Sequence, residues 1–336
     1  MLRNLTRQFQ HVSKLSYSVE AKQQELRLYD EIKIPVPWGE IAGKWWGPKD
    51  VRPILTLHGW QDNCGSFDLL IPFLPKHLSY LTVDFPGHGL SSKIPNGSFY
   101  HGMDGPIMIK RLKDFFGWNK ISLMGHSLGA ITSYTYGFLY PQTVDFMICI
   151  DGLQPLINPK PIDSIIKSID DFVKFEHQNS GDTDPPAYTL EEMAKRLNAG
   201  TRGSIDIDKC KYILERNILP SKNCPGKYFF NRDSRLKCGS LINWPQKDLL
   251  EAAKRVSFPI FISKAAESPF FSNKDYYETL FKILEENNKR CEFHDVPGTH
   301  HAHLNTPEIF KDILPKFIEK YDTEDRTMKT NLKNKF

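Results

Sequence analysis

Long apolar runs and an excess of one charge are both missing from this chain. No stretch approaches the roughly 18 consecutive apolar residues that a membrane-spanning helix needs, so we expect no membrane span. The formal net charge is only +4 over 336 residues, and much of it comes from the two ends of the chain. This composition gives no reason to expect a nucleic-acid partner. With 40% hydrophobic and 25% charged residues, the chain has the composition of an ordinary globular protein.

Cysteine motifs are missing as well. The six cysteines stand at positions 64, 149, 210, 224, 238 and 291, with no Cys-x-x-Cys pair and no matching histidine spacing. They support neither a zinc site nor a redox motif, and we expect neither a metal nor a cofactor. A secretory apolar segment is also absent, so we expect reduced thiols in an intracellular protein, with three disulfides as the alternative.

The first 19 residues contain no acidic side chain. They carry three basic residues among several serines and threonines, and four apolar residues share one face at helical spacing: Leu2, Leu5, Phe9 and Val12. This composition is typical of a mitochondrial presequence. The alternative is an N-terminal extension over residues 1–23 that is disordered or loosely docked. The first interpretation predicts a mitochondrial protein and the second a cytoplasmic one.

The most informative stretch is Gly125-His126-Ser127-Leu128-Gly129. The apolar run 120–124 leads into it, and a helical pattern follows it. This context is typical of a nucleophile elbow, a strained strand-to-helix turn that lifts a serine hydroxyl clear of the backbone. The glycines would stand where neighbouring backbone comes too close for a Cβ atom. An ordinary tight turn between a strand and a helix could have the same pattern, so the stretch needs companions.

One companion lies upstream. The apolar run Ile54–Leu57 ends in His58-Gly59-Trp60, a turn at the exit of a second expected strand. In a fold with a nucleophile elbow, this exit supplies one amide of the oxyanion hole. We expect the backbone amides of Trp60 and Leu128 to form that hole, whereas the alternative is a turn with a structural role only.

The other companion lies near the C-terminus. The strand-like run Cys291–Val296 leads into Pro297-Gly298-Thr299-His300, which places histidines on the loop after the last strand. We expect His300 to be the general base for Ser127, the nucleophile. His301 and His303 follow closely. We expect their side chains to point in other directions and to lie at other depths in the protein than the side chain of His300.

These stretches together resemble the α/β-hydrolases and, more closely, the serine hydrolase-like (Kraken-type) family. The resemblance covers roughly residues 31 to 320 and is carried by several segments: 36–42, 58–63, 66–68, 71–72, 84–92 and, in the middle, 231–236. It implies an α/β fold with a mostly parallel central sheet flanked by helices. It also implies a serine hydrolase that needs no cofactor and whose natural substrate is left open.

Strand and helix patterns also divide the chain. They alternate over 24–152 and again over 256–322, which we expect to form the α/β-hydrolase core. Between them, residues 153–255 have amphipathic helical patterns and are expected to form a lid over the active site that holds the substrate pocket. Residues 323–336 are polar and lack periodicity, so we expect a disordered tail.

The acid that should orient His300 is left open by the sequence. The position where an aspartate is common, after the strand Phe258–Ser263, holds Ser268. Asp151, at the exit of the preceding strand, occupies the alternative position, and Glu267 is one residue out of register with one more methylene of reach. We favour Asp151 over Glu267, although an aspartate at a strand exit can also cap a turn or helix.

The expected reaction is hydrolysis of an ester or related acyl bond, as in a carboxylesterase, through an acyl-enzyme on Ser127. The expected partner is a small-molecule, apolar ester, and no oligomeric state is predicted. The alternative is a non-catalytic ligand-binding or interaction protein that kept the fold while its acid position decayed. Ser268 motivates that alternative.

Overall fold

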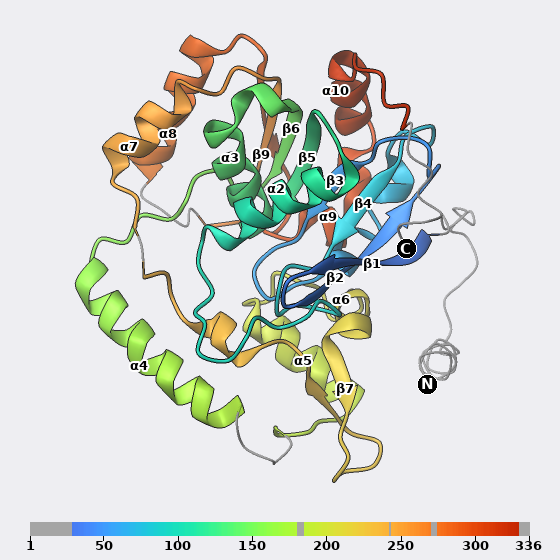
Figure 1. Ribbon diagram of the computed structural model, residues 1–336, viewed down its shortest axis with the longest axis vertical. Coiled ribbons are helices and arrows are strands. Elements are labelled where there is room, and N and C mark those ends of the chain that lie inside the picture. Colours follow the sequence, from blue (N-terminus) through green and yellow to red (C-terminus); the bar gives the residue numbers. More distant parts are fainter. Residues whose placement is uncertain (1–28, 180–184, 242, 270–273, 329–336) are drawn as a thin grey trace.

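The computed structural model describes residues 29–179, 185–241, 243–269 and 274–328, and the expected presequence lies outside these ranges (Figure 1). Its centre is an eight-stranded sheet with the strand order β1-β2-β4-β3-β5-β6-β9-β10. The strands are β1 Tyr29–Val36, β2 Gly39–Trp46, β3 Ile54–Leu57, β4 Tyr80–Val83, β5 Ile121–His126, β6 Val144–Ile150, β9 Ile260–Ala265 and β10 Cys291–Val296.

The sheet is antiparallel at one edge and parallel elsewhere. β1 pairs antiparallel with β2, and β2 pairs antiparallel with β4. From β4 to β10 all neighbouring strands are parallel, with Leu57 of β3 opposite both Val83 and Gly125. The carboxyl ends of β3, β5, β6 and β9 therefore meet at one edge, where open α/β sheets bind their ligands. This is the mostly parallel α/β architecture that the sequence predicts.

Helices cover both faces of the sheet (Figure 1). The buried side chains of one face form a core with α2 Asp104–Phe116, α3 Leu128–Leu139, α7 Gln246–Ala253 and α8 Lys274–Asn287. Those of the other face pack against α9 Ala302–Asn305, α10 Ile313–Tyr321 and two 3-10 helices, Cys64–Phe67 and Ile71–Phe73. The sequence predicts a helix from about Asp104 to Phe116, and α2 has these bounds, because Gly117 follows it in a left-handed conformation with φ 71°.

The sequence pattern favours a helical crossover that contains residues 67–74 and a closing helix that begins at Thr306, and both differ in the structure. Between β3 and β4 the chain forms the two 3-10 helices instead of a crossover α-helix, and Pro72 in the second cannot donate a backbone hydrogen bond. The closing helix begins at Ile313 rather than just after Thr306, because residues Pro307–Phe310 form a separate 3-10 turn.

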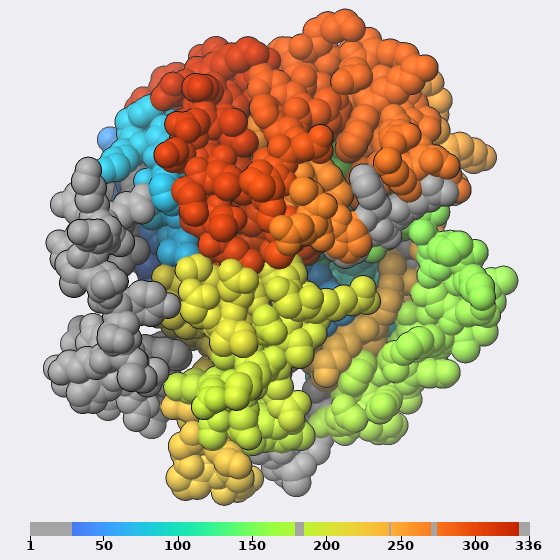
Figure 2. All heavy atoms as spheres, turned by 180° about the vertical axis from the view of Figure 1, so that it is seen from behind, coloured from blue at the N-terminus to red at the C-terminus, as the bar shows by residue number. Residues whose placement is uncertain are grey.

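Apart from α7, the described part of the segment expected to form the lid contains three α-helices and a small hairpin. They are α4 Pro161–Asn179, α5 Leu190–Gly200, α6 Cys210–Asn217, and the two-stranded sheet of β7 Ile218–Pro220 and β8 Tyr228–Phe230. α5 opens with the predicted capping box between Thr189 and Glu192. α5, α6 and the hairpin share a small core that also includes Leu304, and this segment lies directly against the C-terminal part of the chain (Figure 2). α7 packs into the main core instead.

α4 lies along the outside of the molecule (Figure 1). The sequence predicts an apolar face on this helix, but four of its members remain between 48% and 71% exposed: Ile162, Ile166, Ile169 and Val173. Phe172 is closer to the body of the protein, with its ring 5.1 Å from that of Phe99. Among the described helices even α4, 19 residues long, is not apolar enough to span a membrane.

The structure corrects the expectation of a disordered tail over residues 323–328. Residues 323–328 lie against the core, and the Arg326 side chain is buried. Its guanidinium donates to the Ser122 hydroxyl at 2.7 Å and to the Arg52 carbonyl at 3.0 Å, while the Arg52 amide donates back to the Arg326 carbonyl. These contacts are specific to the tertiary structure and leave no periodic pattern in the sequence. Residues 329–336 lie outside the described residues.

Candidate active site

Ser127 forms the whole turn between a strand and a helix. β5 ends at His126 and α3 begins at Leu128, so Ser127 alone changes the chain direction. Its backbone has φ 51° and ψ −114°, a conformation that costs a non-glycine residue free energy. The Ser127 amide donates to the Ile150 carbonyl at 3.0 Å, which ties the turn to the end of β6.

The two glycines around Ser127 are required by close backbone approach. A Cβ atom on Gly125 would lie 2.3 Å from the carbonyl carbon of Gly129. A Cβ atom on Gly129 would lie 2.0 Å from the Leu57 carbonyl oxygen. Any larger residue would displace β3 or α3, so the glycines permit the strained serine to stand above the sheet edge.

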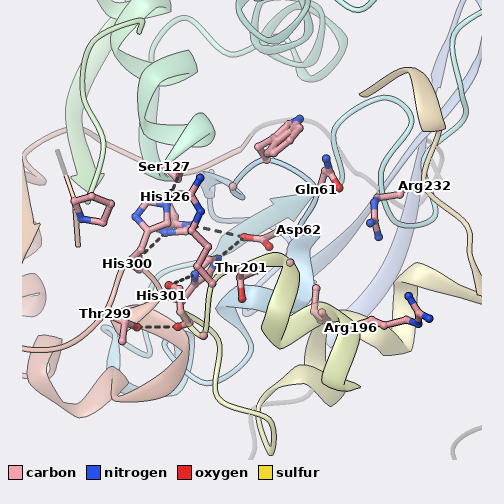
Figure 3. Close-up of a pocket in the computed structure, with 18 of the residues that line it drawn as sticks. Gln61, Asp62, His126, Ser127, Arg196, Thr201, Arg232, Thr299, His300 and His301 are labelled. Atoms are coloured by element: carbon pink, nitrogen blue, oxygen red, sulfur yellow. Dashed lines mark hydrogen bonds and ion pairs between the residues drawn. The ribbon is translucent and has the colours of Figure 1, made fainter. Parts of the chain in front are cut away.

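Ser127, His300 and Asp151 form a continuous hydrogen-bonded chain of side chains. The Ser127 hydroxyl lies 2.9 Å from His300 Nε2, and His300 Nδ1 lies 2.5 Å from Asp151 Oδ2. The three residues follow β5, β10 and β6, so the sheet brings together groups that are 149 and 173 positions apart. Figure 3 shows the imidazole of His300 next to Ser127.

The Asp151 carboxylate is buried and held on both oxygens. Oδ1 accepts from the Ala265 amide at 2.8 Å and lies 3.3 Å from Lys264 Nζ, while Oδ2 accepts from His300. Burial alone would raise the pKa of this carboxyl, but the hydrogen bond and charge of His300 lower the pKa below its usual range. The carboxyl is therefore ionised at neutral pH.

The other residues considered for the acid lie differently. The Glu267 side chain is exposed and lines the pocket, and its amide donates to the Gly298 carbonyl at 3.0 Å. Ser268, at the usual acid position, has its hydroxyl 3.4 Å from His300 Nδ1. The short contact of His300 Nδ1 is thus with Asp151.

The expected oxyanion-hole residues border the site. The Leu128 amide belongs to the first turn of α3, where helical amides have no intrahelical acceptor. Trp60 lines the pocket with Ser127, and both Trp60 and Leu128 line a smaller adjoining cavity. The Trp60 indole donates to the Leu236 carbonyl at 2.7 Å, which fixes the loop after β3.

The pocket in front of Ser127 has a volume of about 630 Å³. Its walls come from the core and from the segment between β6 and β9, including α5 and the residues after β8. Polar and charged side chains are frequent in these walls (Figure 3): Gln61, Arg196, Thr201, Arg202, Arg232 and Glu267.

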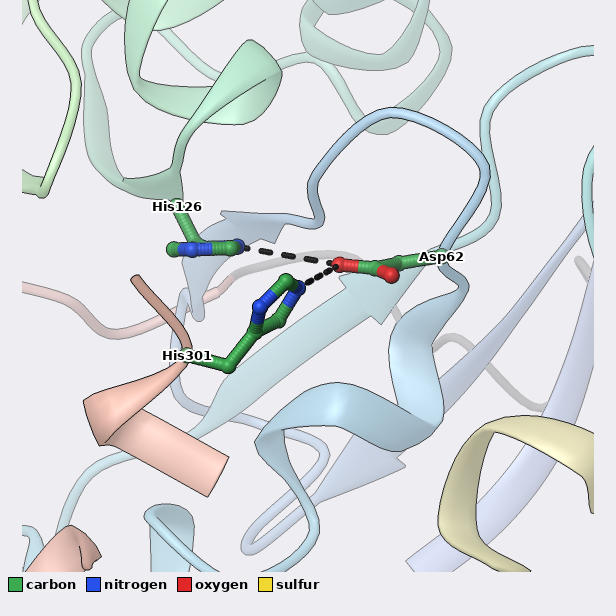
Figure 4. Close-up of side chains that lie close together, drawn as sticks. All are labelled: Asp62, His126 and His301. Carbon is green, nitrogen blue, oxygen red and sulfur yellow. Dashed lines mark hydrogen bonds and ion pairs between the residues drawn. The ribbon is translucent and has the colours of Figure 1, made fainter. Parts of the chain in front are cut away.

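One wall of the pocket contains a buried cluster of Asp62, His126 and His301 (Figure 4). One ligand-type atom from each residue lies within 4.8 Å of the others, and these are donor types that zinc accepts. As the side chains stand, His301 Nε2 donates to Asp62 Oδ2 at 3.2 Å, and the Ser204 hydroxyl lies 2.8 Å from His301 Nδ1. His126 Nε2 lies 2.8 Å from the backbone carbonyl of His300, so the cluster supports the loop that carries His300.

Burial and neighbouring charges lower the pKa values of two members of this cluster, Asp62 and His126. Burial alone would raise the pKa of the Asp62 carboxyl, but the charge of His301 holds it far below its usual range. Burial lowers the pKa of His126 well below that of a free imidazole. Sequence reasoning did not single out Asp62 or His126, because the 239 positions between Asp62 and His301 hide their contact.

Comparison with known proteins identifies the family of this chain. A model of the alpha/beta hydrolase fold family matches residues 52–307, which is most of the chain. The chain belongs to the α/β-hydrolases. Among curated proteins, this α/β-hydrolase is 34% identical over 296 residues to a "Probable serine hydrolase" of Drosophila melanogaster, covering 87% of this chain and 88% of the relative. It is 30% identical over 298 residues to the "Serine hydrolase-like protein" of Danio rerio, covering 87% of this chain and 89% of that relative.

A solved structure has the same architecture. The crystal structure of a hypothetical protein from Pseudomonas aeruginosa PAO1 superimposes with a TM-score of 0.74 and 27% identity, covering 88% of this α/β-hydrolase and all of the other chain. These relatives identify a serine hydrolase-like α/β-hydrolase, as the resemblance at the sequence level implies.

Proposed function

We propose that this protein is a serine hydrolase that cleaves an ester-type acyl bond through an acyl-enzyme on Ser127. The observation that carries the proposal is the chain of hydrogen bonds from Ser127 through His300 to Asp151, at 2.9 and 2.5 Å. A serine hydroxyl is a poor nucleophile until a base removes its proton. The arrangement supplies that base, and a buried ionised carboxylate orients it.

In the acylation step, Ser127 Oγ attacks the carbonyl carbon of the ester while its proton passes to His300 Nε2. The negative charge that develops on the carbonyl oxygen is stabilised by the amides of Trp60 and Leu128 and by the positive end of the α3 dipole. The alcohol then leaves with the proton from His300, and the acyl group remains bonded to Ser127.

In the deacylation step, water gives a proton to His300 Nε2 and attacks the acyl carbon. Collapse of this second tetrahedral intermediate releases the carboxylic acid, and His300 returns the proton to Ser127 Oγ. Throughout the cycle Asp151 keeps the Nδ1 proton of His300 in place and stabilises the imidazolium. The chemistry needs no cofactor.

We also propose that the helical segment after Gly152 acts as a lid and sets substrate selectivity. The proposal is supported by the pocket walls, since Arg196 and Leu197 of α5 and Arg232 after β8 line the pocket in front of Ser127. Segments of this kind exclude water and shape the substrate site in many enzymes.

The test is covalent labelling with a fluorophosphonate probe, followed by turnover of a short p-nitrophenyl ester. We expect the wild-type protein to be labelled and active, and Ser127→Ala to lose both properties while remaining folded by circular dichroism. Ser257→Ala is the matched control, because Ser257 is exposed and lies outside the pocket.

Two outcomes would contradict the proposal. Folded wild-type protein that is never labelled would favour a binding protein on a hydrolase fold. Labelling that persists in Ser127→Ala would move the nucleophile to another residue.

A further inference from the structure

The pocket in front of Ser127 contains an arginine without an anionic partner. Arg232 lines the pocket, and its Nη1 atom is buried without a hydrogen-bond partner in the protein. Arg232 makes no ion pair with any residue in the described part of the chain. A buried donor that lacks an acceptor costs free energy, and the cost is larger when the group is charged.

Arg232, which is partly exposed, differs from the buried arginines. The four arginines that are almost fully buried each form an ion pair with a carboxylate: Arg52 with Asp145, Arg216 with Asp84, Arg235 with Asp233 and Arg326 with Asp322. Arg235 stands only three positions from Arg232 and also donates to the carbonyls of Ile94, Pro95 and Ser98. The fold therefore pairs its structural arginines with acceptors, and Arg232 is not one of them.

The surroundings of Arg232 hold it without neutralising it. Its guanidinium lies 4.2 Å from the centre of the Phe230 ring, a cation–π contact that orients the group but accepts no hydrogen bond. The nearest carboxylate influence comes from Asp62, which already accepts a hydrogen bond from His301. Desolvation lowers the pKa of Arg232 to about 10, so the side chain still carries its charge at neutral pH.

The other charged side chains of the pocket balance one another, so Arg232 gives the lining an excess of positive charge. Arg196 and Arg202 line the pocket at exposed positions, and the acidic lining residues are Asp62 and Glu267. Figure 3 shows Arg232 on the side of the pocket opposite Ser127 and His300. A substrate that spans the pocket would thus meet the nucleophile at one end and a free guanidinium at the other.

From these contacts we infer that the substrate carries a carboxylate at the end remote from the scissile bond, and that Arg232 binds it. The inference rests on the proposed hydrolase function and narrows its substrate class. It replaces the apolar ester expected from the sequence with an ester that has one anionic end. Guanidinium and carboxylate groups match in a two-bond geometry, and Arg232 lines the pocket where such a group would lie.

The experiment compares matched substrates with and without the charge. In one arm the acyl part carries it, with the p-nitrophenyl monoester of adipate against p-nitrophenyl 6-methylheptanoate, which has an isopropyl group in place of the carboxylate. In the other arm the alcohol part carries it, with 4-acetoxybenzoate against 4-isopropylphenyl acetate. The Ser127→Ala protein supplies the background rate for every substrate.

We expect wild-type kcat/KM to favour the anionic substrate by about tenfold to a hundredfold in one arm, the range of a charge-assisted hydrogen bond. Arg232→Gln should reduce this preference to within about threefold of unity, and Arg232→Lys should keep part of it, because lysine retains the charge but not the planar fork. Arg111→Gln, which removes an exposed charge outside the pocket, should keep the full preference.

A binding measurement separates this inference from the proposed function. Adipate should raise the melting temperature of Ser127→Ala protein but not that of the Ser127→Ala, Arg232→Gln double variant. Loss of labelling and turnover in wild-type protein would refute the hydrolase function while this binding test still decides the role of Arg232. An active enzyme with no preference in either arm, or a preference that persists in folded Arg232→Gln, would overturn the inference.

Discussion

Two residues of the candidate site share an uncommon backbone conformation. Ser127 has φ 51° and Asp151 has φ 44°, and each directly follows a central strand. A Cβ atom on Gly152 would lie 2.9 Å from Ser127 Cα, so the two turns are in direct contact. Strain of this kind persists only where the surrounding structure holds it, and it is common at active sites.

At the residue scale, the first prediction concerns the triad acid. Asp151→Asn should lower kcat by about 10⁴, because an amide favours the wrong tautomer of His300 and does not stabilise the imidazolium. Glu267→Gln should change kcat by less than about tenfold, since the exposed Glu267 side chain is not the group 2.5 Å from His300 Nδ1. Steady-state kinetics on one ester measures both variants.

The labelling rate with fluorophosphonate provides a second measurement of the same variants. If Glu267→Gln abolishes turnover while Asp151→Asn remains active, the triad acid is Glu267, which follows β9, and not Asp151. If neither substitution slows turnover, a backbone carbonyl or Ser268 would have to orient His300.

At the scale of elements, α4 and α5 differ in how far their apolar faces are buried. Met193 of α5 is fully buried in the small core, whereas Ile166 of α4 is 55% exposed. Both positions follow the same helical periodicity in the sequence. Only the packing of the surrounding segments decides which face is covered.

This difference predicts unequal effects of shortening the two side chains. Met193→Ala should lower the free energy of unfolding by about 2–5 kcal/mol, because it leaves a cavity in a closed core. Ile166→Ala should change it by less than about 0.5 kcal/mol, since an exposed isoleucine loses little burial and alanine favours the helix. Urea denaturation followed by circular dichroism measures both.

The protein concentration serves as the control in that experiment. A loss of more than about 2 kcal/mol for Ile166→Ala would show that the apolar face of α4 is covered in solution. If the loss also grows with protein concentration, a second copy of the chain covers it.

At the scale of the whole molecule, several histidines are buried in a neutral form. Burial lowers the pKa of His58 and His126, brings that of His88 to about 3 and places that of His303 well below the usual value. Both ring nitrogens of His303 are buried without a partner in the protein, and the ring packs 4.0 Å from that of His126.

These histidines predict that acid destabilises the fold. In the unfolded chain a histidine has a pKa of about 6.5, so between that value and the lowered folded values the unfolded state binds more protons. The contribution of these histidines to the free energy of unfolding is then fully present above about pH 6.5. It is lost as the pH falls, by about 1.4 kcal/mol per pH unit for each such histidine. Urea unfolding between about pH 7 and about pH 5 measures this slope.

His303→Phe isolates one part of that slope. The substitution removes one titrating group and two unpaired nitrogens, so the free energy of unfolding near neutral pH should stay equal or rise. The slope of this free energy with pH should fall by about the contribution of one histidine. His77→Phe, at an exposed position, is the control and should leave the slope unchanged. An unchanged slope for His303→Phe would mean that His303 is protonated in the folded protein.

Features that depend on neighbouring residues could be predicted from the sequence. The glycines around Ser127, the bounds of α2 and the capping box of α5 follow from local sterics and local hydrogen bonds. The order of strands and helices also predicted the mostly parallel sheet, because βα units wind in one direction. Each of these features can be predicted from a short stretch of sequence.

Contacts between distant groups, in contrast, depend on how the whole chain packs. The pairing of β6 with β9 and of β9 with β10 brings Asp151 to His300 across 149 positions, and the sequence left Asp151 and Glu267 both open. The same holds for the Asp62 cluster and for the unpaired guanidinium of Arg232. A change of one residue in strand register turns a side chain to the other face, so such contacts depend on the whole sheet and leave no local signal in the sequence.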